Sequence, residues 1–386
     1  MAGVAARSIT EWRGLGAVVL ALALGMPAAP GPALAGEARA EAGGATAVGW
    51  RPAAGAPAAA AVREALWRGM DYMLHSALVR EHFHEFDSDY LFFFADVARM
   101  DDPWIAWQAR LVGRALGGYY LEHCLRTDSA GAIIDAASAL WALEQLGLDI
   151  DAPLAVLQRA ARQFDREDYL EYAESAGGLP DLDLLIDLVI GFHFTDRMGV
   201  DIGVSYAEVL PHVAGVAYRP EPDAQPNRLI DVNNLITHLV YTLSGYASWN
   251  VPARLLGRER EHIRANMAHA LTWADTETLA EFVDSLKLMG YGVEDRDVAA
   301  GMRLLLALQQ PDGRWQPEDP QDEYDRYHAT WCAMDALRAY RLAGPDRLPD
   351  PVTAWVLERW AAARAAGRPL QPWMPVAPDP VADEQW

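Results

Sequence analysis

The chain has 386 residues, 52% of them apolar and 22% charged, so it can bury a large core and is neither a disordered tail nor a small disulfide-stapled scaffold. Its 54 acidic residues outnumber the 32 basic ones, and a net charge of −22 argues against nucleic acid or anionic lipid as a partner. The sequence contains no Gly-x-Ser-x-Gly elbow, no phosphate-binding glycine-rich loop, no His-Glu-x-x-His and no calcium-binding loop.

The first 35 residues predict an export signal. Arg7 and Arg13 precede an apolar run over residues 15–26, and Ala33 and Ala35 provide small side chains at a cleavage site. The apolar run is shorter than the about 20 residues that a membrane-spanning helix needs. We therefore expect a bacterial periplasmic or secreted protein with no stable membrane span after cleavage.

Beyond the signal, the composition predicts one folded domain with irregular ends. Residues 36–60 predict a flexible Ala/Gly/Pro leader, residues 61–366 the domain, and residues 367–386 a Pro-rich tail. Within the domain, apolar residues recur at the i, i+3, i+4, i+7 spacing of helices, and the alternation typical of strands is scarce. We expect helices over residues 61–80, 87–99, 103–124, 130–147, 151–164, 181–195, 203–216, 229–245, 251–272, 275–290, 294–309, 325–343 and 350–365.

These helices are expected to pair in repeats of about 45 to 55 residues. A single pair cannot bury its apolar face alone, so neighbouring pairs pack on one another, and six pairs close a ring. The predicted fold is therefore all-α, an (α/α)6 toroid of about twelve helices.

A sequence motif supports the same fold. Residues 306–315 read Leu-Ala-Leu-Gln-Gln-Pro-Asp-Gly-Arg-Trp, and Gln309, Gly313 and Trp315 resemble the Gln…Gly-x-Trp (QW-like) repeat of the terpenoid cyclase and protein prenyltransferase superfamily. In that superfamily the motif is structural, with the Gln capping helix ends and the Trp packing beneath them. The resemblance therefore implies an α/α toroid and no particular activity.

A second resemblance lies just downstream. The segment Asp325-Arg-Tyr-His-Ala-Thr-Trp-Cys is similar to the protein prenyltransferase β-subunit segment whose Tyr-His pair carries a zinc-ligating histidine, which implies that His328 is a ligand. The Asp-x-Cys ligands of that family have no counterpart, because residues 281–287 contain no cysteine. The Asp-x-Asp-Asp cluster of the cyclases is also absent. Protein prenylation is therefore set aside, and terpene cyclisation is compatible with the fold but is not supported by a motif.

The segment 231–246 carries an unusually polar stripe. Asp231 and His238 lie seven residues apart and share one helix face with Tyr241. Polar groups inside an otherwise apolar helix cost free energy unless they bond to one another, to water or to a ligand. The stripe indicates either a pocket lining or a buried hydrogen-bond network that braces the fold.

Histidines in the segments expected to line the central cavity suggest a metal centre. We expect His238 and His328 as ligands, with His84 or His193 completing the set and Asp325 or Asp231 as a carboxylate ligand or an orienter of a ring N–H. Zinc, copper and iron all suit such nitrogen and oxygen ligands. The same residues have simpler interpretations, because His82 and His84 can belong to a polar surface loop, and His193 can be a core residue or a charge partner at a helix end.

The resulting functional hypothesis is an exported toroid enzyme with a histidine-based metal site, in which Asp231 or Tyr241 acts as acid or base on a small-molecule, peptide or glycan substrate. One alternative is a non-catalytic binding protein for a hydrophobic ligand or a glycan. Another is a metal-free polysaccharide lyase or hydrolase. The two cysteines, Cys124 and Cys332, either form one long-range disulfide or are two small buried residues.

Overall fold

The computed structural model describes residues 56–170, 182–216, 218, 226–273, 275–315, 323–339 and 351–366. These residues form fifteen helices, which make up 76% of the described chain, and no strand. The predicted all-α class is confirmed. The predicted signal, the leader up to residue 55 and the Pro-rich tail lie outside the described residues.

The helices follow the predicted ranges closely. They are α2 (Ala59–Ala77), α3 (Arg80–Glu85), α4 (Asp87–Val97), α5 (Pro103–His123), α6 (Ala130–Gln145), α7 (Asp151–Ala161), α8 (Arg166–Leu170), α9 (Leu182–Arg197), α10 (Tyr206–Gly215), α11 (Pro226–Leu243), α12 (Gly257–Trp273), α13 (Thr276–Leu288), α14 (Arg296–Leu308), α15 (Glu323–Leu337) and α16 (Pro351–Ala366). The short helices α3 and α8 were not predicted. Because α3 contains His82 and His84, this segment is helical and is not a loop. Helix α12 begins at Gly257 instead of residue 251, after turns that follow Pro252.

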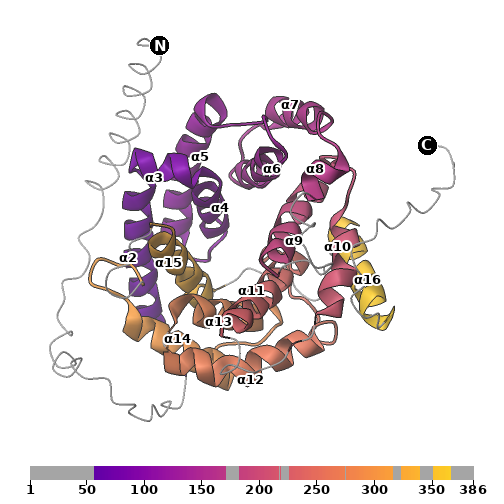
Figure 1. Cartoon of the computed structure of the whole chain (residues 1–386). Helices are drawn as coiled ribbons and strands as arrows, with labels where there is room; N and C mark the ends of the chain where they lie inside the picture. Colours follow the sequence, from indigo (N-terminus) through magenta and orange to yellow (C-terminus); the bar gives the residue numbers. More distant parts are fainter. Residues whose placement is uncertain are drawn as a thin grey trace.

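Six helices form a continuous series of neighbours around the middle of the molecule (Figure 1). Contacts join α4 to α6, α6 to α9, α9 to α11, α11 to α13, and α13 to α15. Helix α15 in turn meets α4, because the Tyr327 hydroxyl donates a hydrogen bond to Asp89 Oδ2 at 2.6 Å and Arg338, directly after α15, forms an ion pair with Asp96. We call these six the inner helices.

The remaining long helices pack outside the inner six (Figure 1). Helix α2 contacts α15, α5 contacts α4, α7 contacts α6, α10 contacts α9, and α12 and α14 contact α13. Helix α16 packs on α10. Buried apolar residues from both sets form one large core, as the amphipathic spacing in the sequence predicts.

Local sequence signals explain where several helices begin. Asp102 accepts hydrogen bonds from the first backbone N–H groups of α5, whose first residue is Pro103. Ser129 caps α6 in the same way, and Asp295 caps α14. A side chain that accepts a bond from an otherwise unpaired N–H group favours the helix start. Lys287, the only lysine of the sequence, bonds to the C-terminal end of α15. Its Nζ donates a hydrogen bond to the Ala336 carbonyl at 2.7 Å.

The QW-like motif joins α14 to α2. Gln309 Nε2 donates to the Ala65 carbonyl of α2 at 2.8 Å and to the Gly313 carbonyl at 2.9 Å. Trp315 is fully buried, and its indole N–H donates to the Leu305 carbonyl at 2.7 Å. The motif residues therefore brace the end of α14 and the turn after it against the first long helix.

Replacement of Gly313 by Ala is expected to destabilise the protein by about 3 kcal/mol. Gly313 has φ +98°, and a Cβ at this position would collide with the backbone of Arg68. Gly118, in the middle of α5, is a matched control, because no atom lies within 4 Å of the position of an added Cβ. Gly118→Ala should therefore stabilise the protein, by about 0.5–1 kcal/mol, through helix propensity. Urea unfolding of both variants tests these opposite signs, and equal shifts would contradict the role of Gly313.

Two further sequence questions are answered by the described residues. Cys124 and Cys332 are both buried and unpaired, so the alternative of a long-range disulfide is wrong. The two side chains lie near different histidines, His84 and His328. Among the described helices, none combines the length and the hydropathy of a membrane-spanning segment.

Candidate functional site

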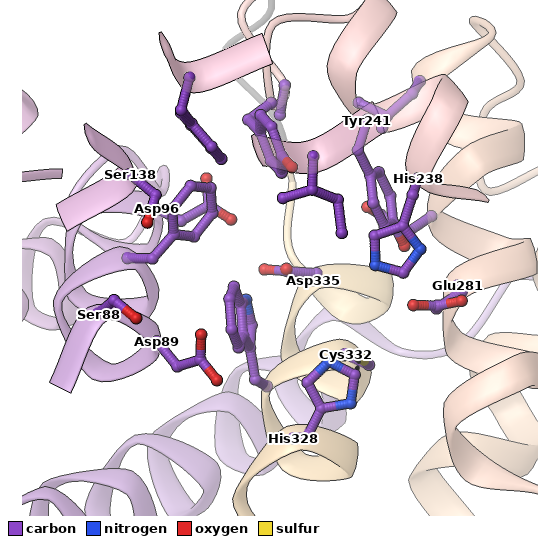
Figure 2. Close-up of a pocket in the computed structure, with 18 of the residues that line it drawn as sticks. Ser88, Asp89, Asp96, Ser138, His238, Tyr241, Glu281, His328, Cys332 and Asp335 are labelled. Carbon is purple, nitrogen blue, oxygen red and sulfur yellow. Dashed lines mark hydrogen bonds between the residues drawn. The ribbon is translucent and has the colours of Figure 1, made fainter. Parts of the chain in front are cut away.

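A cavity of about 170 Å³ lies between the inner helices, and each of the six contributes to its lining (Figure 2). The contributions include Asp89 of α4, Ser138 of α6, Phe194 of α9, His238 of α11, Glu281 of α13 and His328 of α15. Side chains that are far apart in the sequence thus meet at one place. We call this space the central cavity.

The helices α4, α13 and α15 run in the same direction along the central cavity. Asp89 near the start of α4 contacts Tyr327 near the start of α15, whereas Asp96 near the end of α4 contacts Arg338 just after α15. Likewise, Glu277 at the start of α13 contacts His328. We call the end with the helix starts the mouth of the cavity and the end at Arg338 its floor.

Buried ion pairs close the floor. Arg338 and Asp96, each 4% exposed at the side chain, form an ion pair, and Arg99 pairs with the same carboxylate. Arg338 also lies 3.2 Å from Asp335 Oδ1. A second cavity, of about 870 Å³, shares Arg338 as a lining residue. Arg338 and its partners therefore separate the two cavities.

Glu281 carries its carboxyl group in a nearly water-free position. The residue is 1% exposed, and its Oε2 accepts a hydrogen bond from the Thr237 hydroxyl at 2.7 Å. Burial, together with the negative charge of Glu277 one helical turn away, raises the pKa of Glu281 to about 8. Glu281 is therefore mainly protonated at neutral pH and can donate a proton.

His238 has the opposite protonation behaviour. Burial lowers the pKa of its imidazole to about 4, so the ring is neutral at pH 7. Nδ1 lies 2.7 Å from the Asn234 carbonyl, which can only accept, so Nδ1 carries the proton. Nε2 therefore carries a lone pair and can accept a proton. Figure 2 shows His238 and Glu281 on the same side of the cavity.

His328 and Glu277 form an ion pair at the mouth, with Nδ1 and Oε2 3.4 Å apart. Burial opposes a charge on His328, but its neighbours, with Cys332 and Tyr324 the strongest, raise its pKa above the usual value. Burial likewise opposes the charge of Glu277, and His328 outweighs it and lowers the pKa of that carboxyl. Two glutamates one turn apart on α13 thus have opposite protonation states at neutral pH.

The residues predicted from the sequence divide into two groups. His238, His328 and Tyr241 line the central cavity. Asp231 is half-buried on α11 but does not line this cavity, and Asp325 is exposed on α15.

The other two predicted histidines lie elsewhere. His84, on α3, lies 3.0 Å from the Tyr119 hydroxyl. His193 is 3% exposed, and its ring contacts those of Tyr206 and Tyr246. Across the described ranges, no three or more His, Cys, Asp and Glu side chains are placed to hold a metal ion. Of the predicted ligands, the structure brings His238 and His328 together at the central cavity.

Sequence reasoning missed the carboxyl groups of the site. Glu277 and Glu281 lie four residues apart on α13, and this spacing places both on one helix face. That signal was present in the sequence. Their opposite protonation states had no sequence signal, because these depend on burial and on His328 from another helix.

Comparison of the chain with protein-family models, with curated proteins and with solved structures found no match. The geometry and electrostatics of the central cavity are therefore the basis for the functional argument.

Proposed function

We propose that the chain folds as an (α/α)6 toroid whose central cavity is the active site of a metal-independent glycoside hydrolase. The neighbour series of the six inner helices, with outer helices packed around it, supports the toroid. The one observation that carries the reaction is the pair of shifted groups at the cavity, because Glu281 is protonated and His238 is deprotonated at neutral pH. Groups whose environments drive their pKa values apart in this way are suited to act as acid and base.

In this mechanism Glu281 is the general acid. It donates its proton to the glycosidic oxygen as the bond from that oxygen to the anomeric carbon breaks. His238 Nε2 takes a proton from the water that attacks the anomeric carbon. The products are a free sugar and an alcohol, and transfer of the proton from His238 back to Glu281 through solvent restores the starting state.

The lining favours an uncharged or cationic sugar over an acidic one. Arg338 is the cation at the floor, and Asp96 and Asp335 already pair with it. A lyase that acts on a uronate needs a free cation or a metal to neutralise the substrate carboxylate, so hydrolysis is the better fit to this lining. Aromatic side chains offer apolar faces for a sugar ring, and the ring centroids of two of them, Phe92 and Trp331, lie 5.4 Å apart.

The size of the cavity limits the substrate to one ring. A volume of about 170 Å³ is close to that of the engineered apolar cavity, roughly 150 Å³, that binds benzene. We therefore infer that the cavity takes one terminal sugar unit. The export signal predicted over residues 1–35 supports a periplasmic or extracellular place of action.

The proposal is tested by incubating the purified protein with a panel of p-nitrophenyl glycosides and with cellulose, xylan, chitin and chitosan, and by measuring nitrophenol and reducing ends. Release in the presence of EDTA is the expected result. Release that is lost in EDTA and restored by zinc would replace this proposal with the metal centre. No release from any substrate, with or without added metal, would overturn the hydrolase.

The pH profile of kcat/KM on the best substrate is expected to be bell-shaped, with limbs near pH 4 and pH 8. The base must be unprotonated, so activity falls as the pH drops through the pKa of His238, about 4. The acid must be protonated, so activity also falls as the pH rises through the pKa of Glu281, about 8. Thr237→Val, which removes the hydroxyl donor to Glu281, should shift the alkaline limb upward and leave the acid limb in place. An alkaline limb unmoved by this variant would show that another group is the acid.

A further inference from the structure

One aromatic side chain marks where the central cavity opens to solvent. Tyr324, the second residue of α15, lines the cavity and is 37% exposed. All the other described lining residues are buried or half-buried. At the opposite end, the ion pair of Arg338 with Asp96 closes the floor. A part of a ligand that does not fit inside the cavity therefore leaves it past Tyr324.

Neighbouring side chains hold the Tyr324 ring in place. The ring stacks on the His328 imidazole, with centroids 4.7 Å apart and planes 16° from parallel. His328 in turn pairs with Glu277 of α13, with Nδ1 and Oε2 3.4 Å apart. The ring of Phe86, between α3 and α4, lies 6.0 Å from Tyr324 in a tilted orientation. A side chain that is already ordered loses little further conformational entropy when a ligand binds to it.

The stack leaves part of the Tyr324 ring accessible. Because the His328 imidazole lies nearly parallel to the ring, it covers one face of the ring. The exposed part of Tyr324 therefore lies outside the stack, at the mouth of the cavity. A flat aromatic surface of this kind offers an apolar face on which a second ring can stack.

The proposed general acid lies on the inner side of Tyr324. On α13, Glu281 is one turn beyond Glu277, which contacts His328. On α15, Tyr324 is one turn before His328. Because the two helices run in the same direction, Tyr324 is about two helical turns nearer to solvent than Glu281. A sugar held deeper in the cavity than Glu281 therefore has its leaving group on the side where Tyr324 lies.

We propose that Tyr324, stacked on His328, forms a binding subsite for the leaving group, and that this subsite takes a second sugar ring. This inference rests on the proposed hydrolase and specifies the part of the substrate beyond the cleaved bond. The central cavity holds the terminal sugar, Glu281 protonates the bridging oxygen, and Tyr324 orients the departing ring. The preferred substrate is therefore a disaccharide or the end of a longer glycan, and not a simple alkyl glycoside.

The test measures affinities by isothermal titration calorimetry with sulfur-linked probes, which resist hydrolysis, so that it does not depend on turnover. The probes are the thio-linked disaccharide, the phenyl thioglycoside and the methyl thioglycoside of the sugar that the glycoside panel favours, or of glucose if no panel member is cleaved. The disaccharide is expected to bind about tenfold more tightly than the methyl probe. Tyr324→Ala should abolish this difference and leave the affinity for the methyl probe unchanged.

Two further variants serve as controls. Tyr324→Phe keeps the ring and should keep the preference for the disaccharide. Trp107 of α5 is a matched aromatic residue away from the cavity, because it is 42% exposed and stacks on Trp104, with centroids 4.9 Å apart and planes 25° from parallel. Trp107→Ala should therefore bind all three probes like the parent. A loss in this control as large as that in Tyr324→Ala would remove the specific role of Tyr324.

The remaining outcomes separate this inference from the proposed function. Equal binding of the disaccharide and the methyl probe, a preference that survives Tyr324→Ala, or no binding of any probe would overturn the subsite. Tighter binding of the phenyl probe alone would replace the sugar ring with an aryl leaving group. A Tyr324-dependent preference for the disaccharide without cleavage of its oxygen-linked form would support the subsite and contradict the hydrolase. Cleavage of glycosides without this preference would do the reverse.

Discussion

Replacement of Glu281 by Gln is expected to lower kcat/KM for glycoside cleavage about a thousandfold, the size of a typical general-acid contribution. Gln keeps the size of the side chain and can still accept the Thr237 hydrogen bond at 2.7 Å, but it has no acidic proton. The loss should therefore fall on kcat, with ligand affinity close to that of the parent. The measurement is steady-state kinetics on the best substrate of the glycoside panel, beside calorimetric binding.

Glu144→Gln provides the matched control for this variant. Glu144 is an exposed glutamate near the C-terminal end of α6, another inner helix, so the same chemical change is made away from the cavity. The control should retain full activity. A Glu281→Gln variant that is folded, binds ligand and keeps more than about a tenth of the parent kcat would remove Glu281 from the acid role.

Replacement of Asp96 by Ala is expected to lower the free energy of unfolding by about 3–5 kcal/mol. Asp96 is 3% exposed and pairs with both Arg338 and Arg99. Without its carboxylate, the buried Arg338 guanidinium loses its closest charge partner at the floor of the cavity, and a buried charge without compensation is strongly destabilising. Urea unfolding monitored by circular dichroism gives the change in free energy.

The Asp128→Ala variant is the control for this measurement. Asp128 pairs with Arg126, but the two side chains are 68% and 70% exposed, so their ion pair should contribute about 0–1 kcal/mol. If Asp96→Ala costs no more than this control, the floor network does not stabilise the fold.

The stability difference between the parent and Asp96→Ala should also depend on pH. Burial opposes the charge of Asp96, but Arg338 and Arg99 outweigh it and hold the pKa of this carboxyl below its usual value. A depressed carboxyl pKa contributes stability above the pKa of the unfolded chain, and this contribution is lost as the pH falls through the folded value. The difference in free energy of unfolding should therefore be largest at neutral pH and should decrease as the pH falls. A constant difference down to the acid unfolding transition would contradict the ion-pair explanation.

Much of the helical fold could be predicted because its signals are local. The apolar spacing predicts each of the long helices, and Asp102, Ser129 and Asp295 fix where three of them begin. The turn around Gly313 and Trp315 was also recognisable from the sequence, because two of its hydrogen bonds join residues that are close in sequence. A third hydrogen bond joins the end of α14 to α2. The start of α4 at Asp87 was predicted, but the short helix α3 (Arg80–Glu85) was missed, because its polar residues do not show a helical apolar pattern.

The site was only partly predictable, and His193 illustrates why. Ile190 and Phe194, four residues apart on α9, line the cavity, so the neighbouring His193 is rotated away by about 100° along the helix. It packs instead against Tyr206 of α10. His238 and Tyr241, by contrast, belong to the polar stripe that was visible in the sequence, and both line the cavity.

The sequence by itself determined the helical class, the helix boundaries to within a few residues, and three of the polar side chains at the cavity, because periodicity and capping act within one helix. Only the tertiary structure decided which groups can exchange protons. Glu281 is protonated and His238 is neutral because the packing of the helices buries both side chains, and because the charge of Glu277 lies one turn from Glu281. Desolvation and through-space charge depend on distances between helices, and no local pattern in the sequence encodes them.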